Sequence, residues 1–376
     1  MAVYTVLDRK FAVNLAENYG LGRVTKLTGV SAGSVNTYYL LETTKGKFFI
    51  RIDEVKSPAR ARRELDLLLT LRAHGFRCPQ PLVDRQKQLL SIYHGKPVSL
   101  YYPLPGKQLL ESQLSPRHLE HVGATLASLH LLSPSLPQGE ENRFDSHRVL
   151  LLYQGIRNKL PSYFKQVLHT LDDEVVYLQQ YQEDRLPRGL IHGDVFADNL
   201  RFRGERVVGL LDFDAACHGK FLYDIATAIN ALCYRDDHYL IECFESFLSG
   251  YQRLRSLSLA EWDAFPTELR FSAFRFTVTR LKDFFLRPMN GGIRVEKDFR
   301  EFLERLQVLR RERPGGMDRL LLALATGYDY RQYQKIPGQA EKPEGRKRND
   351  SQRTGSRKRP ATAERRKTDK RVRTAH

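Results

Sequence analysis

The chain has 376 residues, of which 41% are hydrophobic, so it is long enough for two lobes and a sizeable buried core. No apolar run reaches the ~18 residues of a membrane-spanning helix. The N-terminus carries Asp8, Arg9 and Lys10 where a secretory signal needs an apolar stretch. The sequence therefore predicts a soluble, cytoplasmic protein. The four cysteines form no C-x-x-C pair, which argues against a zinc site or a disulfide framework.

The formal net charge of +17 is concentrated at the end of the chain. Between Glu341 and Arg373 stand 14 Lys or Arg and 5 Asp or Glu, so this segment carries +9 and the rest of the chain only +8. A mildly basic folded part does not indicate a dedicated nucleic-acid-binding protein. A flexible basic tail can attach to nucleic acid or an anionic membrane in a salt-dependent way. The favoured alternative is a tail that only keeps the protein soluble.

Residues 1–102 are predicted to form a small nucleotide-binding lobe rich in strands. The apolar runs Tyr38–Leu41 and Phe48–Ile52 flank a turn, which is the pattern of strand, turn and strand. A helix should follow, with Ser57 as its N-cap and Gly75 as its stop signal.

The pattern turns helical after a hinge at residues 103–106. Ser115 and Pro116 open one helix, and further helices are expected around 147–184, 222–234, 238–254 and 266–287. We expect residues 103–315 to form a larger catalytic and substrate lobe, 316–336 a helical extension, and 337–376 a disordered basic tail. The predicted class is α+β, with an antiparallel-sheet lobe carrying one main helix and a larger, mostly helical lobe.

The strongest functional signal is a pair of motifs between these helices. Residues 192–199 read H-x-D-x-x-x-x-N, and a strand ending in Asp-Phe-Asp follows at 212–214. Phosphoryl transfer needs a carboxylate that orients the attacking hydroxyl and oxygen ligands that hold Mg²⁺ on the nucleotide. We predict Asp194 as the catalytic base and Asn199 and Asp212 as the metal ligands. The alternative is a polar turn between two buried strands that carries these groups by accident, and His192 is predicted to be structural.

A second signal is a Gly- and Ser-rich turn upstream, where backbone N–H groups can approach phosphate oxygens. Its predicted nucleotide-binding residues are Gly29, Ser31, Gly33, Ser34 and Asn36. An ordinary hairpin fits this turn as well.

Two charged residues after this turn complete the predicted nucleotide site. Arg51 is the candidate cation for the phosphates and Glu64 its candidate ion-pair partner, the alternative being a surface arginine and a solvated glutamate. Asp224, at the start of a helix, is predicted to brace the catalytic loop or only to favour the helix dipole.

Taken together, these motifs resemble the aminoglycoside phosphotransferase and choline kinase superfamily, which has the protein-kinase-like fold. Within it, the chain is most similar to the bacterial homoserine kinases of the second type, from about Ala2 to Arg310. The likeness rests on Tyr19–Gly22, the 29–36 turn, 191–199, 212–217, 222–226, 279–281 and 297–299. The resemblance implies ATP and Mg²⁺ as cofactors, with adenine near Ser99–Pro103. It also implies phosphorylation of L-homoserine to O-phospho-L-homoserine in threonine synthesis.

Three positions depart from the homoserine kinase pattern. Asp214 stands where those enzymes usually have Tyr, Val35 where they often have Glu, and Arg51 where they usually lack a basic residue. Because Asp214 offers a ligand for a cationic amine, the acceptor stays open. The alternatives are another amino alcohol, a sugar, an aminoglycoside or a protein Ser/Thr.

Overall fold

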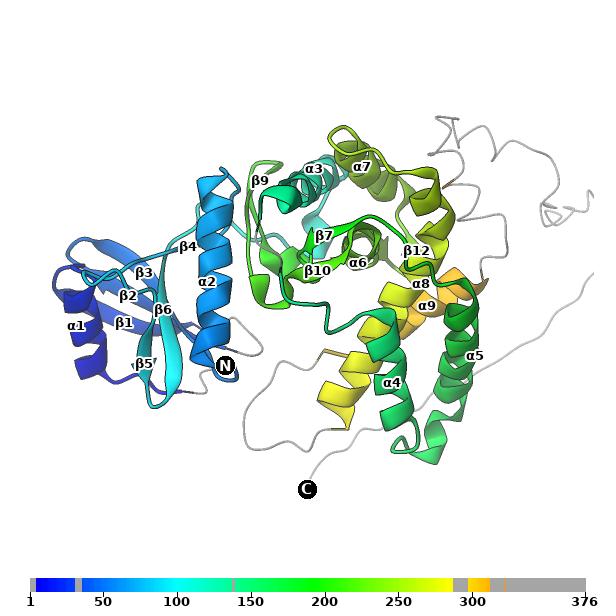
Figure 1. Ribbon diagram of the computed structural model, residues 1–376, viewed down its shortest axis with the longest axis horizontal. Helices are drawn as coiled ribbons and strands as arrows, with labels where there is room; N and C mark the ends of the chain where they lie inside the picture. Colours follow the sequence, from blue (N-terminus) through cyan, green and yellow to red (C-terminus); the bar gives the residue numbers. More distant parts are fainter. Residues whose placement is uncertain (1–4, 31–35, 137–138, 287–296, 312–320, 322–376) are drawn as a thin grey trace, which may run out of the picture. The chain divides into compact units, whose positions relative to one another are not determined.

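The computed structural model describes residues 5–30, 36–136, 139–286, 297–311 and 321 (Figure 1). Residues 1–330 form one compact unit. Apart from Leu321, the expected extension 316–336 and the expected tail 337–376 lie outside the described residues. Within the described residues, no helix combines the length and apolarity needed to cross a bilayer.

The small lobe is an antiparallel sheet with one helix before it and one inserted after its third strand. The sheet order is β1-β2-β3-β6-β4, and β5 pairs with β6. The elements are α1 (Arg9–Asn18), β1 (Val24–Val30), β2 (Thr37–Thr43), β3 (Gly46–Ile52), α2 (Pro58–Ala73), β4 (Gln80–Pro81), β5 (Ser91–Tyr93) and β6 (Lys96–Tyr102).

The strand β3 has two buried faces. Phe48, Ile50 and Ile52 alternate along it and pack into the small core beneath α1, as their spacing predicted. On the opposite face Arg51 is also buried. Helix α2 lies on the Arg51 side of β3. Its buried leucines belong to the same apolar cluster as residues of the large lobe. Figure 1 shows α2 between the sheet and the helices that follow. The helix that carries Glu64 is therefore fixed against both lobes.

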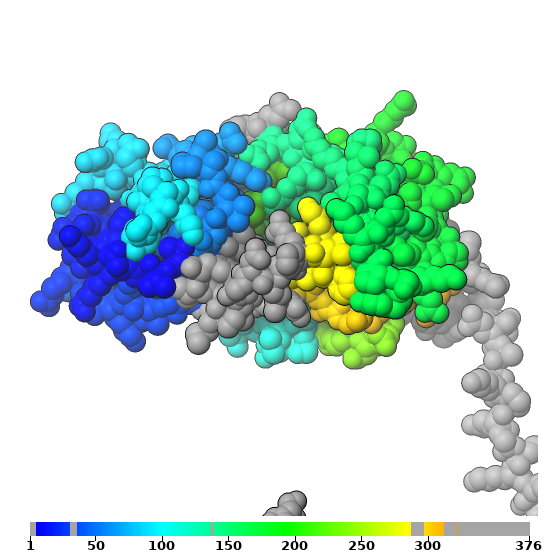
Figure 2. All heavy atoms as spheres, turned by 90° about the horizontal axis from the view of Figure 1, so that it is seen from below, coloured from blue at the N-terminus to red at the C-terminus, as the bar shows by residue number. Residues whose placement is uncertain are grey.

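The large lobe is mostly helical, as predicted, and encloses two short antiparallel strand pairs, β7 with β10 and β8 with β9. Its longer helices are α3 (Pro116–Leu132), α4 (Ser146–Arg157), α5 (Lys165–Tyr181), α6 (Phe221–Leu232), α7 (Ile241–Gln252), α8 (Leu259–Arg280) and α9 (Arg300–Arg311). The strands are β7 (Arg188–Ile191), β8 (Leu200–Arg203), β9 (Arg206–Leu210), β10 (Cys217–Lys220), β11 (Tyr234–Arg235) and β12 (His238–Tyr239). Figure 2 shows the end of α8, in yellow, at the surface beside green atoms of the preceding helices.

The stretch around 147–184 is helical, as predicted, and consists of two helices, α4 and α5. Pro161 lies between them, and a proline removes a backbone donor and forces the residue before it out of the helical region. The helix predicted to begin near 266 begins at Leu259. A capping box between Ser258 and Glu261 starts it, and Pro266 is accommodated inside it.

The helix predicted over 238–254 begins later, at Ile241. The residues before it form the hairpin β11–β12. Its two turn residues, Asp236 and Asp237, have φ angles of 50° and 63°, the left-handed conformation that tight hairpins require. An Asp-Asp turn is a weaker sequence signal than Asn-Gly, which is why the hairpin was missed.

Candidate active site

The three residues predicted to act on the phosphate come together at the ends of the two short strand pairs, β7 with β10 and β8 with β9. Asn199 Nδ2 donates to the backbone oxygen of Asp194 (2.9 Å) and lies 3.4 Å from its Oδ2. The N–H of Leu211 donates to the Asn199 carbonyl (2.8 Å), which brings the following Asp212 to the same turn. Because the Asn199 nitrogen is used in the loop, the amide oxygen points the other way and is available as a ligand.

Asp212 lies in an open cleft, exposed to solvent, and its backbone is strained. Its φ and ψ angles of 59° and 73° are left-handed, which a residue other than glycine rarely adopts. Although the residue as a whole is exposed, the protein atoms around its carboxyl partly desolvate it and raise its pKa; the charges of Asp214 and Asp194 raise the pKa further, and Arg51 opposes them. A cation placed among these carboxylates would relieve their mutual repulsion.

The catalytic loop is held from behind by Asp224, at the start of α6. Its two carboxylate oxygens accept from the backbone N–H groups of His192 (2.7 Å) and Gly193 (2.7 Å), and His130 lies 3.1 Å away. Burial pushes the pKa of Asp224 up, but hydrogen bonds and charge from His130 and His192 outweigh it, and the net shift is downward. The bracing role predicted for Asp224 is thus confirmed.

His192 is structural, as predicted, because both ring nitrogens are engaged inside the loop. Nε2 donates to the Leu211 carbonyl (2.8 Å) and Nδ1 accepts from the N–H of Asp194 (3.3 Å). Gly193 has a φ of +74°, and a Cβ there would lie 3.0 Å from the carbonyl oxygen of Ala215. The glycine therefore allows the Asp194 loop to pack closely against the turn that carries Asp212.

An Asp224→Ala variant should lose about 2–6 kcal/mol of unfolding free energy, because two buried N–H groups lose their acceptor at ~1–3 kcal/mol each. Urea unfolding of the full chain would measure this. Because the pKa of Asp224 is lowered in the folded protein, its contribution to stability depends on pH. The contribution is fully present above the pKa of about 3.9 of the unfolded carboxyl, and it is lost as the pH falls through the lower pKa of the folded state. The difference from wild type should therefore narrow in acid, and a difference independent of pH would contradict the bracing by an ionised Asp224.

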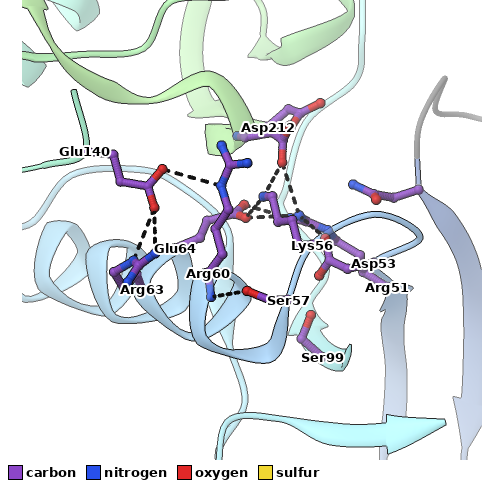
Figure 3. A network of polar contacts seen from close by, with 12 residues as sticks. Arg51, Asp53, Lys56, Ser57, Arg60, Arg63, Glu64, Ser99, Glu140 and Asp212 are labelled. Atoms are coloured by element: carbon purple, nitrogen blue, oxygen red, sulfur yellow. Dashed lines mark hydrogen bonds and ion pairs between the residues drawn. The ribbon is translucent and has the colours of Figure 1, made fainter. Parts of the chain in front are cut away.

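Arg51 is the centre of a buried ion-pair network between β3 and α2 (Figure 3). Its guanidinium donates to both oxygens of Glu64 (2.7 and 3.0 Å) and to Asp53 (2.6 Å). Burial raises the pKa of Glu64, but Arg51 and Lys56 outweigh it and the net shift is downward. The predicted Arg51–Glu64 pair is present, and a surface arginine beside a solvated glutamate is excluded.

Lys56 is a residue that the sequence reasoning missed. Its Nζ contacts Glu64 of the small lobe and Asp214 of the large lobe, and its side chain is 8% exposed. Asp214 also lies 3.8 Å from Arg51 and 3.6 Å from Arg143. The carboxylate suggested as a ligand for a substrate amine is therefore already paired with the protein's own cations. In the sequence, Lys56 is marked only by its place immediately before the helix cap Ser57, and this does not indicate its partners.

The Gly- and Ser-rich turn is only partly described. Gly29 lies in β1, paired with Tyr39 of β2. Asn36 is buried, and its Oδ1 accepts from the N–H of Glu54 (3.4 Å). Ser31, Gly33 and Ser34 lie outside the described residues. Ser99, near the expected adenine position, is buried in β6 and donates to the Tyr101 hydroxyl (3.0 Å).

A family model described as "Phosphotransferase enzyme family" matches residues 26–257. The chain belongs to this phosphotransferase family. The homoserine kinase of Agrobacterium fabrum is 32% identical over 312 residues, which cover 82% of this chain and 95% of that protein. The homoserine kinase of Nitrobacter winogradskyi is 34% identical over 325 residues, covering 84% and 96%. The resemblance seen in the sequence is confirmed, and the protein is a kinase.

Solved structures of lower identity share the fold of this phosphotransferase. An amicoumacin kinase in complex with AMP-PNP, Ca²⁺ and Ami has a TM-score of 0.60 at 18% identity, covering 87% of this chain and 97% of that one. A spectinomycin phosphotransferase in complex with ADP and spectinomycin has a TM-score of 0.62 at 13% identity, covering 85% and 99%. They confirm the two-lobed kinase-like fold.

The charge of this phosphotransferase's cleft favours a divalent cation. Three cations, Arg51, Lys56 and Arg143, stand with five carboxylates, those of Asp53, Glu64, Asp194, Asp212 and Asp214. No three His, Cys, Asp or Glu among the described residues are grouped closely enough to hold a metal by themselves. An ion at Asp212 would therefore also need the amide oxygen of Asn199 and phosphate oxygens of a nucleotide, which is the hard-oxygen set that Mg²⁺ prefers.

Proposed function

We propose that this kinase transfers the γ-phosphoryl group of ATP to the side-chain hydroxyl of L-homoserine, giving O-phospho-L-homoserine and ADP for threonine synthesis. The observation that carries the proposal is the match to homoserine kinases over almost their whole length. The contact between Asn199 and Asp194, with Asp212 at the same turn, supports it, because such a transfer needs a carboxylate base close to oxygen ligands for a cation.

Each of these residues has a separate part in the proposal. Asp194, half-buried and held by its loop, orients the acceptor hydroxyl and accepts its proton as the new bond forms. Asn199 and Asp212 hold Mg²⁺ through oxygen atoms. The ion, when bound, neutralises charge on the phosphate oxygens. Both lobes therefore contribute, because the nucleotide's phosphates must reach these residues from the small lobe.

The nucleotide would lie against the small lobe. The turn at 29–36, with Gly29, Ser31, Gly33, Ser34 and Asn36, is proposed to carry the phosphates on its backbone N–H groups. Arg51 would contribute positive charge and Glu64 would orient it, as their paired geometry supports. Adenine would lie near Ser99–Pro103, where β6 ends and the large lobe begins.

The decisive experiment is a coupled ADP-release assay of the full chain over a panel of acceptors. We expect turnover with L-homoserine and far less with choline, a sugar, an aminoglycoside or a Ser/Thr peptide, and none without Mg²⁺. Preferred turnover of any other acceptor would overturn the substrate while leaving the kinase chemistry in place. This is the main rival, because an amicoumacin kinase and a spectinomycin phosphotransferase share this fold.

The basic segment 337–376 supplies a separate hypothesis, of polyanion contact. Its 14 Lys or Arg would give salt-dependent binding without sequence preference. Deleting 337–376 and measuring polyanion binding at two salt concentrations tests this. Binding that survives the deletion would exclude the segment as its source.

A further inference from the structure

Arg275 is a buried cation without a counter-charge. It lies in the middle of α8 and is 5% exposed. Its guanidinium carbon lies 4.0 Å from the ring centre of Phe144 and 3.8 Å from that of Phe276. Among the described residues, its side chain makes no hydrogen bond and no ion pair, and its buried Nε has no partner. Aromatic rings compensate only part of the cost of taking a guanidinium out of water.

Two other buried arginines of this lobe, Arg280 and Arg305, have oxygen acceptors, although the Nε of Arg280 lacks a partner, and the partly buried Arg270 has acceptors too. Arg270, on the same helix, donates to both oxygens of Glu174 (2.9 and 2.6 Å). Arg280 donates to Glu301 (2.7 Å), and Arg305 donates to the carbonyl oxygen of Asn230 (2.7 Å). Arg275 differs from these because none of its guanidinium nitrogens has an acceptor among the described residues, and a buried polar group without an acceptor costs free energy. An acceptor for it would have to come from outside the described residues.

Two series of side-chain contacts connect Arg275 to the segments that carry Asp194 and Asp214. The ring of Phe276 lies 5.2 Å from the ring of Phe196, two residues after Asp194. On the other side, Arg143 also lies over Phe144, at 4.9 Å, and its guanidinium is 3.6 Å from Asp214. Arg275 therefore lies on the large-lobe side of the site, connected through these aromatic contacts to the segments that carry Asp194 and Asp214. This is the side on which an acceptor, not the nucleotide, would bind.

We propose that Arg275 binds the carboxylate of the acceptor. The inference rests on the proposed function, since it assumes an amino-acid acceptor over Asp194. The rings of Phe144 and Phe276 pack against the guanidinium and restrict it before a ligand arrives, while no described residue accepts a hydrogen bond from it. A planar fork of this kind matches a carboxylate with two parallel hydrogen bonds. Arg275 would thus select for hydroxy amino acids against neutral or cationic alcohols.

The test compares L-homoserine with L-homoserinamide, which keeps the hydroxyl and the amine but lacks the negative charge. Wild type should prefer L-homoserine by roughly 10²–10³-fold in kcat/KM, as expected for a desolvated charge pair. Arg275→Met should lower kcat/KM for L-homoserine by about the same factor and leave that for the amide nearly unchanged. KM for ATP should stay constant in both proteins. Arg275→Lys keeps the charge without the planar pair of N–H donors, so its kcat/KM for L-homoserine should lie between those of wild type and Arg275→Met.

Arg270→Met is the matched control, because Arg270 is on the same helix and also lies against a ring, 3.3 Å from the centre of Tyr177, but has Glu174 as its partner. It should lose thermal stability and keep the preference for L-homoserine. If Arg275→Met slows both acceptors equally, Arg275 is only structural and the inference fails while the homoserine kinase proposal stands. If wild type does not phosphorylate L-homoserine at all, the proposed function and this inference fall together.

Discussion

An Asp194→Asn variant should turn over on the order of 10²–10⁴-fold more slowly than wild type, with KM for ATP and for the acceptor nearly unchanged. The substitution keeps the shape of the side chain and removes the oxygen that accepts the hydroxyl proton. The loop itself should survive, because Asn199 donates to the backbone oxygen of residue 194, which the substitution leaves in place. Steady-state kinetics at saturating Mg²⁺ would measure the change.

Asp198→Asn is the matched control for this loop. Asp198 is exposed, whereas Asp194 is half-buried and next to Asn199. Removing its charge should change kcat less than about threefold, in line with the small effects of surface substitutions. Near-normal turnover by Asp194→Asn would remove Asp194 from the proposed role. An equal loss in both variants would point to a general effect of negative charge in the loop.

The residues that could be predicted from the sequence are those whose function depends on a short, fixed spacing. Asp194 and Asn199 are five residues apart on one loop, so their proximity follows from local geometry. Arg51 and Glu64 are separated by 13 residues but lie on a strand and the helix directly after it. For each pair, the short separation allows few arrangements of the chain. The pattern of apolar residues around the pair then indicates which arrangement forms.

The residues that were missed depend on contacts between distant segments. Lys56 meets Asp214 across more than 150 positions, and nothing near either residue in the sequence indicates the other. Arg275 shows the same limit, since an arginine on a helix is ordinarily paired or solvated. Its isolation appears only once Phe144 is placed against it. Whether a buried charge has a partner depends on tertiary packing and cannot be predicted from the residue types along the chain.

Asp212→Asn should give the largest loss of activity, about 10³-fold or more, if Asp212 carries the metal, because an active-site cation supplies several kcal/mol of charge stabilisation. Asparagine tolerates the left-handed backbone found here and can still accept from the N–H of Asp214 (3.3 Å). The variant should therefore fold. Without ligand it should be as stable as wild type or more so, because a carboxylate near Asp194 and Asp214 has been neutralised.

Thermal unfolding with and without MgADP separates this role from a structural one. Wild type should gain stability from MgADP in proportion to the logarithm of ligand concentration over Kd, and Asp212→Asn should lose most of that gain. ADP alone, with a chelator present, should stabilise both proteins weakly, because the carboxylates of the cleft outnumber its cations. A variant that is less stable without ligand, yet keeps the full MgADP shift, would show that Asp212 supports the turn and holds no metal. If Asp212 binds the metal, the variant should keep the thermal stability of wild type without ligand and lose the gain in stability that MgADP produces.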